Sequence, residues 1–374
     1  MCWEATDRLY DFRYALRANP RSVYRCTRHC KSVLGASVPR EKAEELRRRL
    51  ALLHLVDKRH AIVEEGDRIV IPLMSVPDST LLDIFHASLT EGAFSQRGSF
   101  VDPIDEVRAS AAIPEDLKPR LPGKWERFGD VGVLKIEPGL ENYESEIARA
   151  YASVLGLKAV LREVGPIQGE YRRPSMKVLL GSDTVAVHVE NRILYKLDVS
   201  DIMFSSGNQE ERLRMAGLRC ESETVVDMFA GIGYFSLPLA VYQTPRRVIA
   251  CEINPKAHGY LVENVGLNKV GSIVEPVLGD NRDLPGEAIA DRVIMGYVKT
   301  THEFLPTALR LVKDGGMIHY HETCPNELLP RRPLQRLQDA ARPGTVQVLR
   351  TKAIKSYAPG VSHVVLDVRV LKSS

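Results

Sequence analysis

The chain has 374 residues, of which 44% are hydrophobic and 26% are charged, a composition typical of a globular protein of two or three domains. No apolar run approaches the roughly 18 residues of a transmembrane helix, and the N-terminus lacks the apolar segment of a signal peptide. The six cysteines are scattered, which argues against a disulfide framework and for the cytoplasm. We expect a cytoplasmic protein that acts as a monomer without contacting a membrane.

Positive charge is concentrated near the N-terminus. The net charge is +3, yet residues 1–60 contain 14 Lys and Arg against 7 Asp and Glu, a surplus of seven that leaves −4 for the remainder. Such asymmetry predicts that the front of the chain contacts a polyanion. A solvated basic surface is the alternative.

Two groups of residues raise the question of a metal. Cys26 and Cys30 lie near His29, but no second ligand pair follows them. His319 and His321 alternate along an apolar segment without a third ligand. We therefore predict no metal site.

The first part of the chain is predicted to be a basic extension followed by a small α+β domain. The extension covers residues 1–35. A helix is expected over residues 36–57, because apolar residues recur there every three or four positions and Pro39 suits a first turn. With a strand at 67–73, this domain is predicted to span residues 36–105.

A second α+β domain is predicted over residues 106–195. Residues 102–124 contain four prolines and are interpreted as a linker or an irregular segment. A helix is predicted at 141–156. The strands of this domain are expected at 130–136, 177–180 and 184–198, with a turn at Glu190-Asn191.

Residues 196–374 alternate strands with helices, which predicts an α/β domain with a parallel, doubly wound sheet. The parallel strands are expected at 224–229, 247–253, 273–280, 291–297 and 317–323. The last two segments, 346–360 and 362–371, meet at Gly360 and are predicted to form an antiparallel pair at the sheet edge.

The first of these strands predicts a ligand pocket. It ends in Asp227 and leads into a turn with Gly231 and Gly233, where the backbone approaches a ligand closely. Ser236 stands where the dinucleotide fingerprint has its third glycine, so a pyrophosphate site is disfavoured.

Acidic residues also end the next two strands. Glu252 is placed to accept hydrogen bonds from ribose hydroxyls, and Asp280-Asn281 is placed at an adenine edge. Each alone is an ordinary strand-end residue. Together with the glycine turn they predict a nucleoside site, and S-adenosylmethionine has a ribose and an adenine but no phosphate.

The segments DMFAGIGYFSLPLA, CEINPKAH and GDNRDL resemble the archaeal and eukaryotic tRNA guanine-37 N1-methyltransferase superfamily, which has a class I methyltransferase fold, Rossmann-like, behind small N-terminal α+β domains. MFSSGNQEERLRMA and VIMGYVKTTHEFL resemble its wybutosine-synthesising branch. The resemblance covers residues 36–374 and implies that the α+β domain at residues 106–195 binds RNA. The predicted residues that bind the donor are Ser205, Arg212, Asp227, Phe229, Gly231, Gly233, Glu252, Asp280, Asn281 and Gly296.

The resemblance implies transfer of the 3-amino-3-carboxypropyl group of S-adenosylmethionine to C7 of 4-demethylwyosine at position 37 in the anticodon loop of tRNA(Phe). It identifies no catalytic residue. A tRNA guanine-37 N1-methyltransferase and a non-catalytic RNA-binding sensor of the cofactor are the alternatives.

One difference from the methyltransferases favours the first reading. Those enzymes tend to have an Asn-Pro-Pro or Asn-Leu-Pro motif where this chain has Gly296-Tyr297-Val298. We expect Gly296 to leave space for a tricyclic base and Tyr297 to stack on it, unless Tyr297 is a core aromatic. Arg212 is predicted to hold the donor's carboxylate in its two-pronged fork. The alternatives are a helix-surface residue and a ligand of a tRNA phosphate.

Overall fold

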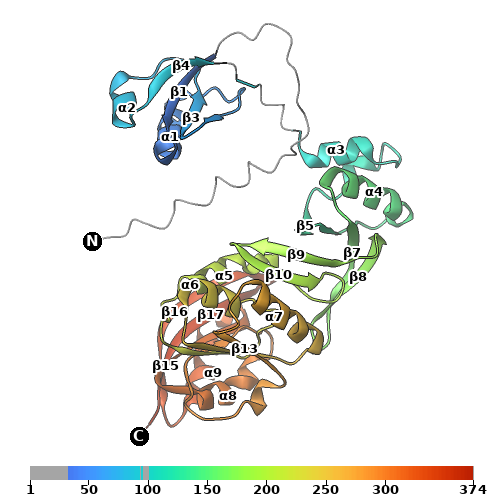
Figure 1. Cartoon of the computed structure of the whole chain (residues 1–374). Helices are drawn as coiled ribbons and strands as arrows, with labels where there is room; N and C mark the ends of the chain where they lie inside the picture. The colour runs from blue at the N-terminus through green and yellow to red at the C-terminus, as the bar shows by residue number, and fades with distance from the viewer. Residues whose placement is uncertain (1–32, 93, 96–100, 374) are drawn as a thin grey trace. The chain divides into compact units, whose positions relative to one another are not determined.

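The computed structural model describes residues 33–92, 94–95 and 101–373, and the chain divides into two compact units, residues 1–101 and 102–374 (Figure 1). Nearly all of the predicted extension, with Cys26 and Cys30, lies outside the described residues. In the part of the chain that is described, no helix is both long and apolar enough to cross a membrane.

The first unit contains an antiparallel four-stranded sheet in the order β2-β3-β1-β4. Its elements are β1 (Val33–Pro39), η1 (Arg40–Lys42), α1 (Ala43–Leu52), β2 (Val63–Glu65), β3 (Arg68–Pro72), α2 (Ser79–Ile84) and β4 (Ser88–Gly92). The helix predicted over residues 36–57 therefore begins later and ends at Leu52, and that prediction was wrong for residues 36–39 and 53–57. Ala36 and Val38 are fully buried in a strand that pairs on both sides. This pairing with segments distant in sequence outweighs the local helical pattern.

The second unit begins with α3 (Pro103–Ser110), within a stretch predicted to be irregular. Asp102 caps this helix by accepting a hydrogen bond from the backbone N–H of Ile104 (3.2 Å), and Pro103 occupies the first turn, where it needs no hydrogen-bond partner. The elements that follow are η2 (Lys118–Arg120), β5 (Trp125–Phe128), β6 (Val131–Leu134), η3 (Glu141–Tyr143), α4 (Glu144–Leu155), β7 (Ala159–Gln168) and β8 (Arg173–Leu180). The four strands form one sheet in chain order.

The hairpin of β9 (Val185–Glu190) and β10 (Ile193–Asp198) joins this part to the rest of the second unit. Its turn, Asn191-Arg192, lies one residue after the predicted one, and both residues have positive φ. The backbone N–H groups of Leu194 and Lys196 donate to Asn268 (2.9 Å) and Asn264 (2.7 Å) at α7. One hydrophobic cluster includes residues from 128 to 294, so the border predicted at 195–196 falls inside a shared core.

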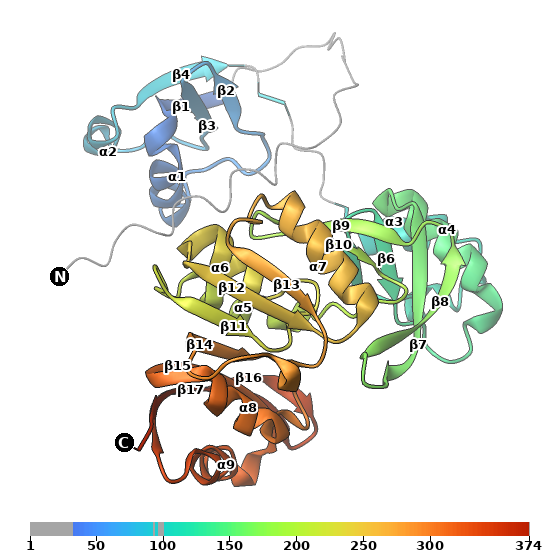
Figure 2. The same ribbon diagram turned by 60° about the horizontal axis from the view of Figure 1, so that its bottom comes forward.

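A seven-stranded sheet forms the centre of the second unit, in the order β13-β12-β11-β14-β15-β17-β16 (Figure 2). Its strands are β11 (Thr224–Asp227), β12 (Arg247–Glu252), β13 (Val274–Leu278), β14 (Ala290–Met295), β15 (Val312–Pro325), β16 (Thr345–Ala358) and β17 (Val361–Leu371). The first five strands in this order are parallel, whereas β17 is antiparallel to both β15 and β16. The predicted antiparallel pair at the edge is confirmed.

Helices cover both faces of this sheet, which confirms the doubly wound α/β class. The helical elements are η4 (Ser206–Asn208), α5 (Gln209–Ala216), α6 (Ser236–Gln243), α7 (Pro255–Leu267), η5 (Asn281–Asp283), η6 (Thr301–Phe304), α8 (Leu305–Leu311), η7 (Asn326–Leu328) and α9 (Arg331–Ala341). Val225 packs in one cluster with side chains of α6 and α7. The next residue, Val226, packs in a second cluster with α8 and α9 on the opposite face.

Candidate functional site

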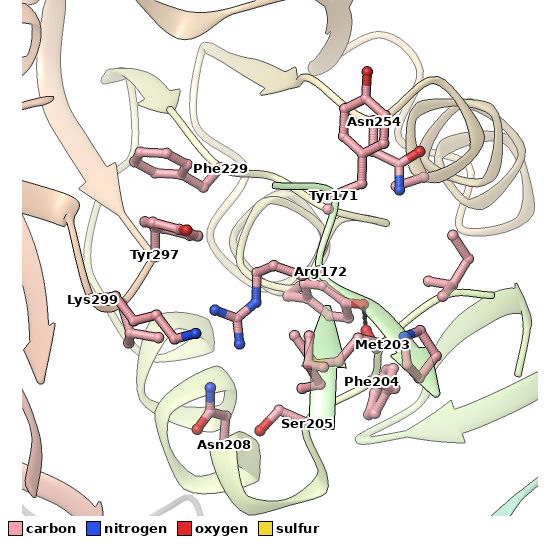
Figure 3. A pocket seen from close by; sticks show the side chains of 18 of the residues that line it. Tyr171, Arg172, Met203, Phe204, Ser205, Asn208, Phe229, Asn254, Tyr297 and Lys299 are labelled. Carbon is pink, nitrogen blue, oxygen red and sulfur yellow. Dashed lines mark hydrogen bonds between the residues drawn. The ribbon is translucent and has the colours of Figure 1, made fainter. Parts of the chain in front are cut away.

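A cavity of about 910 Å³ opens where the strand order reverses between β11 and β14. Ligands of such sheets bind at this place, beyond the carboxyl ends of the strands. Figure 3 shows side chains that point into it from several elements, Phe229 and Tyr297 among them. Of the predicted residues, those that line the cavity are Ser205, Arg212, Phe229, Gly231, Glu252, Asp280, Asn281, Gly296 and Tyr297.

Asp227 and Gly233, predicted to bind the donor, lie behind the cavity wall. Asp227 is fully buried, accepts hydrogen bonds from Ser236 Oγ (2.7 Å) and Phe229 N (3.3 Å), and has its pKa raised to about 6 by burial. A Cβ on Gly233 would lie 2.6 Å from Leu237 Cγ, so the missing side chain lets α6 pack closely. Both residues shape the turn that carries Gly231.

The Glu252 carboxylate lies at the end of β12 and holds two loops. Oε2 accepts a hydrogen bond from the backbone N–H of Gly231 and Oε1 accepts one from that of Asn254, each at 2.8 Å. Burial raises the pKa of Glu252. Each carboxylate oxygen can accept a second hydrogen bond, so this geometry suits a pair of ribose hydroxyls.

Asn281 has a buried side-chain oxygen that can accept a hydrogen bond from a ligand. Its Nδ2 donates to the Met228 carbonyl (3.0 Å), whereas its buried Oδ1 has no hydrogen-bond partner among the described residues. An unsatisfied buried acceptor costs about 1–3 kcal/mol, and an exocyclic amino group such as that of adenine would satisfy it. The neighbouring Asp280 pairs with Arg282, which lowers the pKa of Asp280. The cavity therefore fits an adenosine.

The fork of Arg212 is directed at a protein carboxylate. Nε and Nη2 donate to the two oxygens of Glu190 (2.6 and 2.7 Å), and Nη1 donates to the Ser205 carbonyl (2.9 Å). The guanidinium carbon also lies 4.6 Å from the centroid of the Phe204 ring. In this structure Arg212 positions the Ser205 segment, and a direct contact with the donor stays a prediction.

The missing side chain of Gly296 makes room for an aromatic ring of the protein, and the space expected there for a tricyclic base stays a prediction. A Cβ at this position would lie 2.6 Å from the Phe235 ring. The aromatic ring of Phe235 thus fills the place that a side chain at 296 would take. Tyr297 is half-buried and stacks on Phe229, with ring centroids 5.2 Å apart. The guanidinium carbon of Arg172 lies 5.6 Å from the Tyr297 centroid.

Several residues that line the cavity were not predicted from the sequence. Tyr171 and Arg172 come from the turn of the β7–β8 hairpin, and Figure 3 shows Arg172 and Lys299 pointing into the same space. Lys355 and His363 come from paired positions of β16 and β17. None of these residues follows a strand-end or glycine signal, which is why the sequence pattern did not identify them.

The two histidines of β15 belong to a buried polar network. His319 contacts Asp367 (Nδ1–Oδ1 2.5 Å) and Arg292 (2.7 Å), and His321 contacts His363 (3.0 Å). Burial lowers the pKa of His319 and His321, which favours the neutral imidazoles. No group of three His, Cys, Asp or Glu side chains is placed to hold a metal ion anywhere in the described residues.

The chain is similar in sequence to proteins of one known family. Residues 186–349 match the TRM5/TYW2 methyltransferase domain, residues 107–184 the TYW2 N-terminal domain, and residues 37–81 the tRNA methyltransferase 5 N-terminal domain. The tRNA(Phe) (4-demethylwyosine(37)-C(7)) aminocarboxypropyltransferase of Pyrococcus horikoshii is 53% identical over 266 residues, which cover 71% of this chain and 95% of that relative. The chain belongs to the TRM5/TYW2 family.

Both branches of the TRM5/TYW2 family are similar to this chain. The Pyrococcus abyssi tRNA (guanine(37)-N(1))-methyltransferase Trm5b is 36% identical over 341 residues, covering 90% of the chain and 99% of that relative. The crystal structure of P. horikoshii TYW2 in complex with MeSAdo has a TM-score of 0.67 and 50% identity over 72% of this chain and 100% of that one. The resemblance stated from the sequence motifs is thereby confirmed.

Proposed function

We propose that this protein transfers the 3-amino-3-carboxypropyl group of S-adenosylmethionine to C7 of 4-demethylwyosine at position 37 of tRNA(Phe). The observation that supports it most strongly is the 53% identity to an enzyme named for this reaction, against 36% to the methyltransferase. The cavity adds acceptors suited to adenosine at Glu252 and Asn281.

The reaction joins two carbons and needs no nucleophile from the protein. The acceptor carbon attacks the γ-carbon of the amino acid arm, the γ-carbon–sulfur bond breaks, and its electron pair stays on sulfur to give methylthioadenosine. The acceptor carbon then loses its proton and the ring regains aromaticity. The protein's task is to place the γ-carbon, rather than the methyl group, in line with the acceptor.

The leaving nucleoside tests this proposal. On incubation with S-adenosylmethionine and tRNA(Phe) that carries 4-demethylwyosine, we expect methylthioadenosine in amounts equal to the modified tRNA, measured by liquid chromatography and mass spectrometry. Adenosylhomocysteine would instead show methyl transfer, as in a guanine-37 N1-methyltransferase. Binding of both substrates without either product would favour the cofactor-sensing alternative.

The same proposal includes the anticodon loop of tRNA as partner, contacted in part by the first unit. A protein of residues 102–374 keeps the shared core intact, whereas a cut at residue 200 would separate the β9–β10 hairpin from α7. We expect the 102–374 protein to bind S-adenosylmethionine like the full chain but to lose most of its tRNA affinity. Full-length binding should weaken steeply with salt, because phosphate contacts release counterions.

Filter binding at several salt concentrations measures this prediction, with calorimetry of S-adenosylmethionine as the control for folding. Equal tRNA affinity of the 102–374 protein and the full chain would remove the first unit from tRNA binding.

A further inference from the structure

Lys355 is a cation of the cavity wall that forms no ion pair with any described carboxylate. It lies half-buried on β16, and its Nζ donates a hydrogen bond to Ser205 Oγ (2.8 Å). Within the described residues, no carboxylate lies within 4 Å of Nζ. Partial burial of an ammonium group without an ion pair is unfavourable, so this arrangement favours an anionic ligand beside Nζ.

The surroundings of Lys355 strengthen this requirement. Burial lowers the pKa of its ammonium group, and the positive charges of Arg212 and Arg172 lower it further, whereas the negative charge of Glu126, another lining residue, raises it. A Cβ at Gly207 would lie 3.1 Å from Nζ, so the glycine of η4 allows the lysine to approach. The ammonium is held on a strand of the central sheet rather than on a mobile surface chain.

Arg212 and Lys355 contact different atoms of Ser205 and differ in whether a carboxylate neutralises them. The fork of Arg212 is neutralised by Glu190, and its Nη1 donates to the Ser205 carbonyl. Lys355 contacts the hydroxyl of the same serine. Ser205 is thus fixed through its carbonyl by one cation, and its hydroxyl is presented to the cavity beside the other.

We propose that Lys355 Nζ, with the Ser205 hydroxyl, binds the carboxylate of the amino acid arm of S-adenosylmethionine, and that Arg212 positions Ser205 for this contact. The inference rests on the proposed function for the identity of the donor. Adenosine contacts at Glu252 and Asn281 account for the nucleoside end, and the arm has a single negatively charged group. Lys355 is then a residue that selects the γ-carbon, because holding the carboxylate restrains the rotation of the arm.

The affinities of three ligands distinguish a contact between Lys355 and the carboxylate from a change in the shape of the whole cavity. S-adenosylmethionine has the carboxylate, decarboxylated S-adenosylmethionine has the sulfonium and the amine without it, and methylthioadenosine has neither arm nor charge. Calorimetry with the full-length protein measures the affinity of each for wild type, Lys355→Met and Lys355→Arg. Lys352→Met is the matched control, since Lys352 lies on the same strand and pairs with Glu210 outside the cavity.

We expect Lys355→Met to lower S-adenosylmethionine affinity about 10- to 100-fold, the range of a charge-assisted hydrogen bond, and to change the other two affinities less than about twofold. Lys355→Arg should restore part of the loss, and Lys352→Met should change nothing. Wild type should also prefer S-adenosylmethionine to its decarboxylated form, a measurement that needs no variant.

Equal losses for all three ligands, or an unchanged S-adenosylmethionine affinity, would overturn the proposal. A loss of tRNA affinity alone would assign Lys355 to a phosphate or to the acceptor base instead. The proposed reaction is tested separately, by the nucleoside product. Release of adenosylhomocysteine by wild type would refute that reaction but would not affect the proposed carboxylate contact.

Discussion

Replacing Arg212 with alanine will lower the free energy of unfolding by about 3–5 kcal/mol, the usual loss when one partner of a buried ion pair is removed. Arg212 is 2% exposed and Glu190 is 8% exposed, so the carboxylate left behind stays inside the protein without a counter-ion. The substitution also removes the hydrogen bond from Arg212 to the Ser205 carbonyl. Ser205 lies beside Lys355 in the cavity wall, so its position there becomes less fixed. Transfer activity at temperatures where the variant is folded should therefore fall as well.

Urea unfolding followed by circular dichroism measures the loss of stability. Leu213→Ala is the matched control, because this neighbour in α5 is 48% exposed and should change stability by less than about 1 kcal/mol. Replacing both Arg212 and Glu190 with methionine should recover much of the stability but not the activity. An Arg212→Ala protein as stable as wild type would show that Glu190 is solvated or protonated in the folded state.

Replacing Glu252 with alanine will weaken S-adenosylmethionine binding about 10- to 100-fold. The substitution removes the acceptor proposed for the ribose hydroxyls. It also releases the backbone N–H groups of Gly231 and Asn254, which its carboxylate holds at 2.8 Å. Methylthioadenosine affinity should fall by the same factor, because both ligands share the ribose.

Calorimetry with both ligands measures this prediction, and Glu275→Ala is the control, since Glu275 is an exposed residue of the adjacent strand β13 that pairs with Arg247. Glu252→Gln should be intermediate, because the amide keeps one acceptor oxygen. Unchanged affinity in a folded Glu252→Ala protein would exclude Glu252 from the ribose contact.

The candidate site was predictable where its signals are local. Glu252 ends β12 and Asp280 follows β13 by two residues, and parallel strands present their carboxyl ends at one edge of a sheet. The glycine turn after β11 adds a backbone signal. Function also followed from local motifs, since the segments at residues 203–216 and 293–305 carried the resemblance to the wybutosine-synthesising branch.

Other parts of the site could not be predicted, because their roles depend on contacts between distant segments. Arg212 has the same sequence neighbours whether it binds a ligand or Glu190, and only the folding of β9 against α5 brings Glu190 to it. Lys355 looks like any lysine of an edge strand until β16 pairs with β17 and brings it beside Ser205, 150 residues earlier.

The sequence by itself determined the parallel α/β sheet, its antiparallel edge and the acceptors that we propose for an adenosine, since these follow from periodicity and from the ends of individual strands. The tertiary structure alone decided the strand at residues 33–39, the helix at residues 103–110 and the partners of Arg212 and Lys355 in the cavity. The physical reason is the range of the interactions. Strand pairing, burial and charge compensation depend on groups that are near in space and far apart in the chain, and no local pattern records which of them meet.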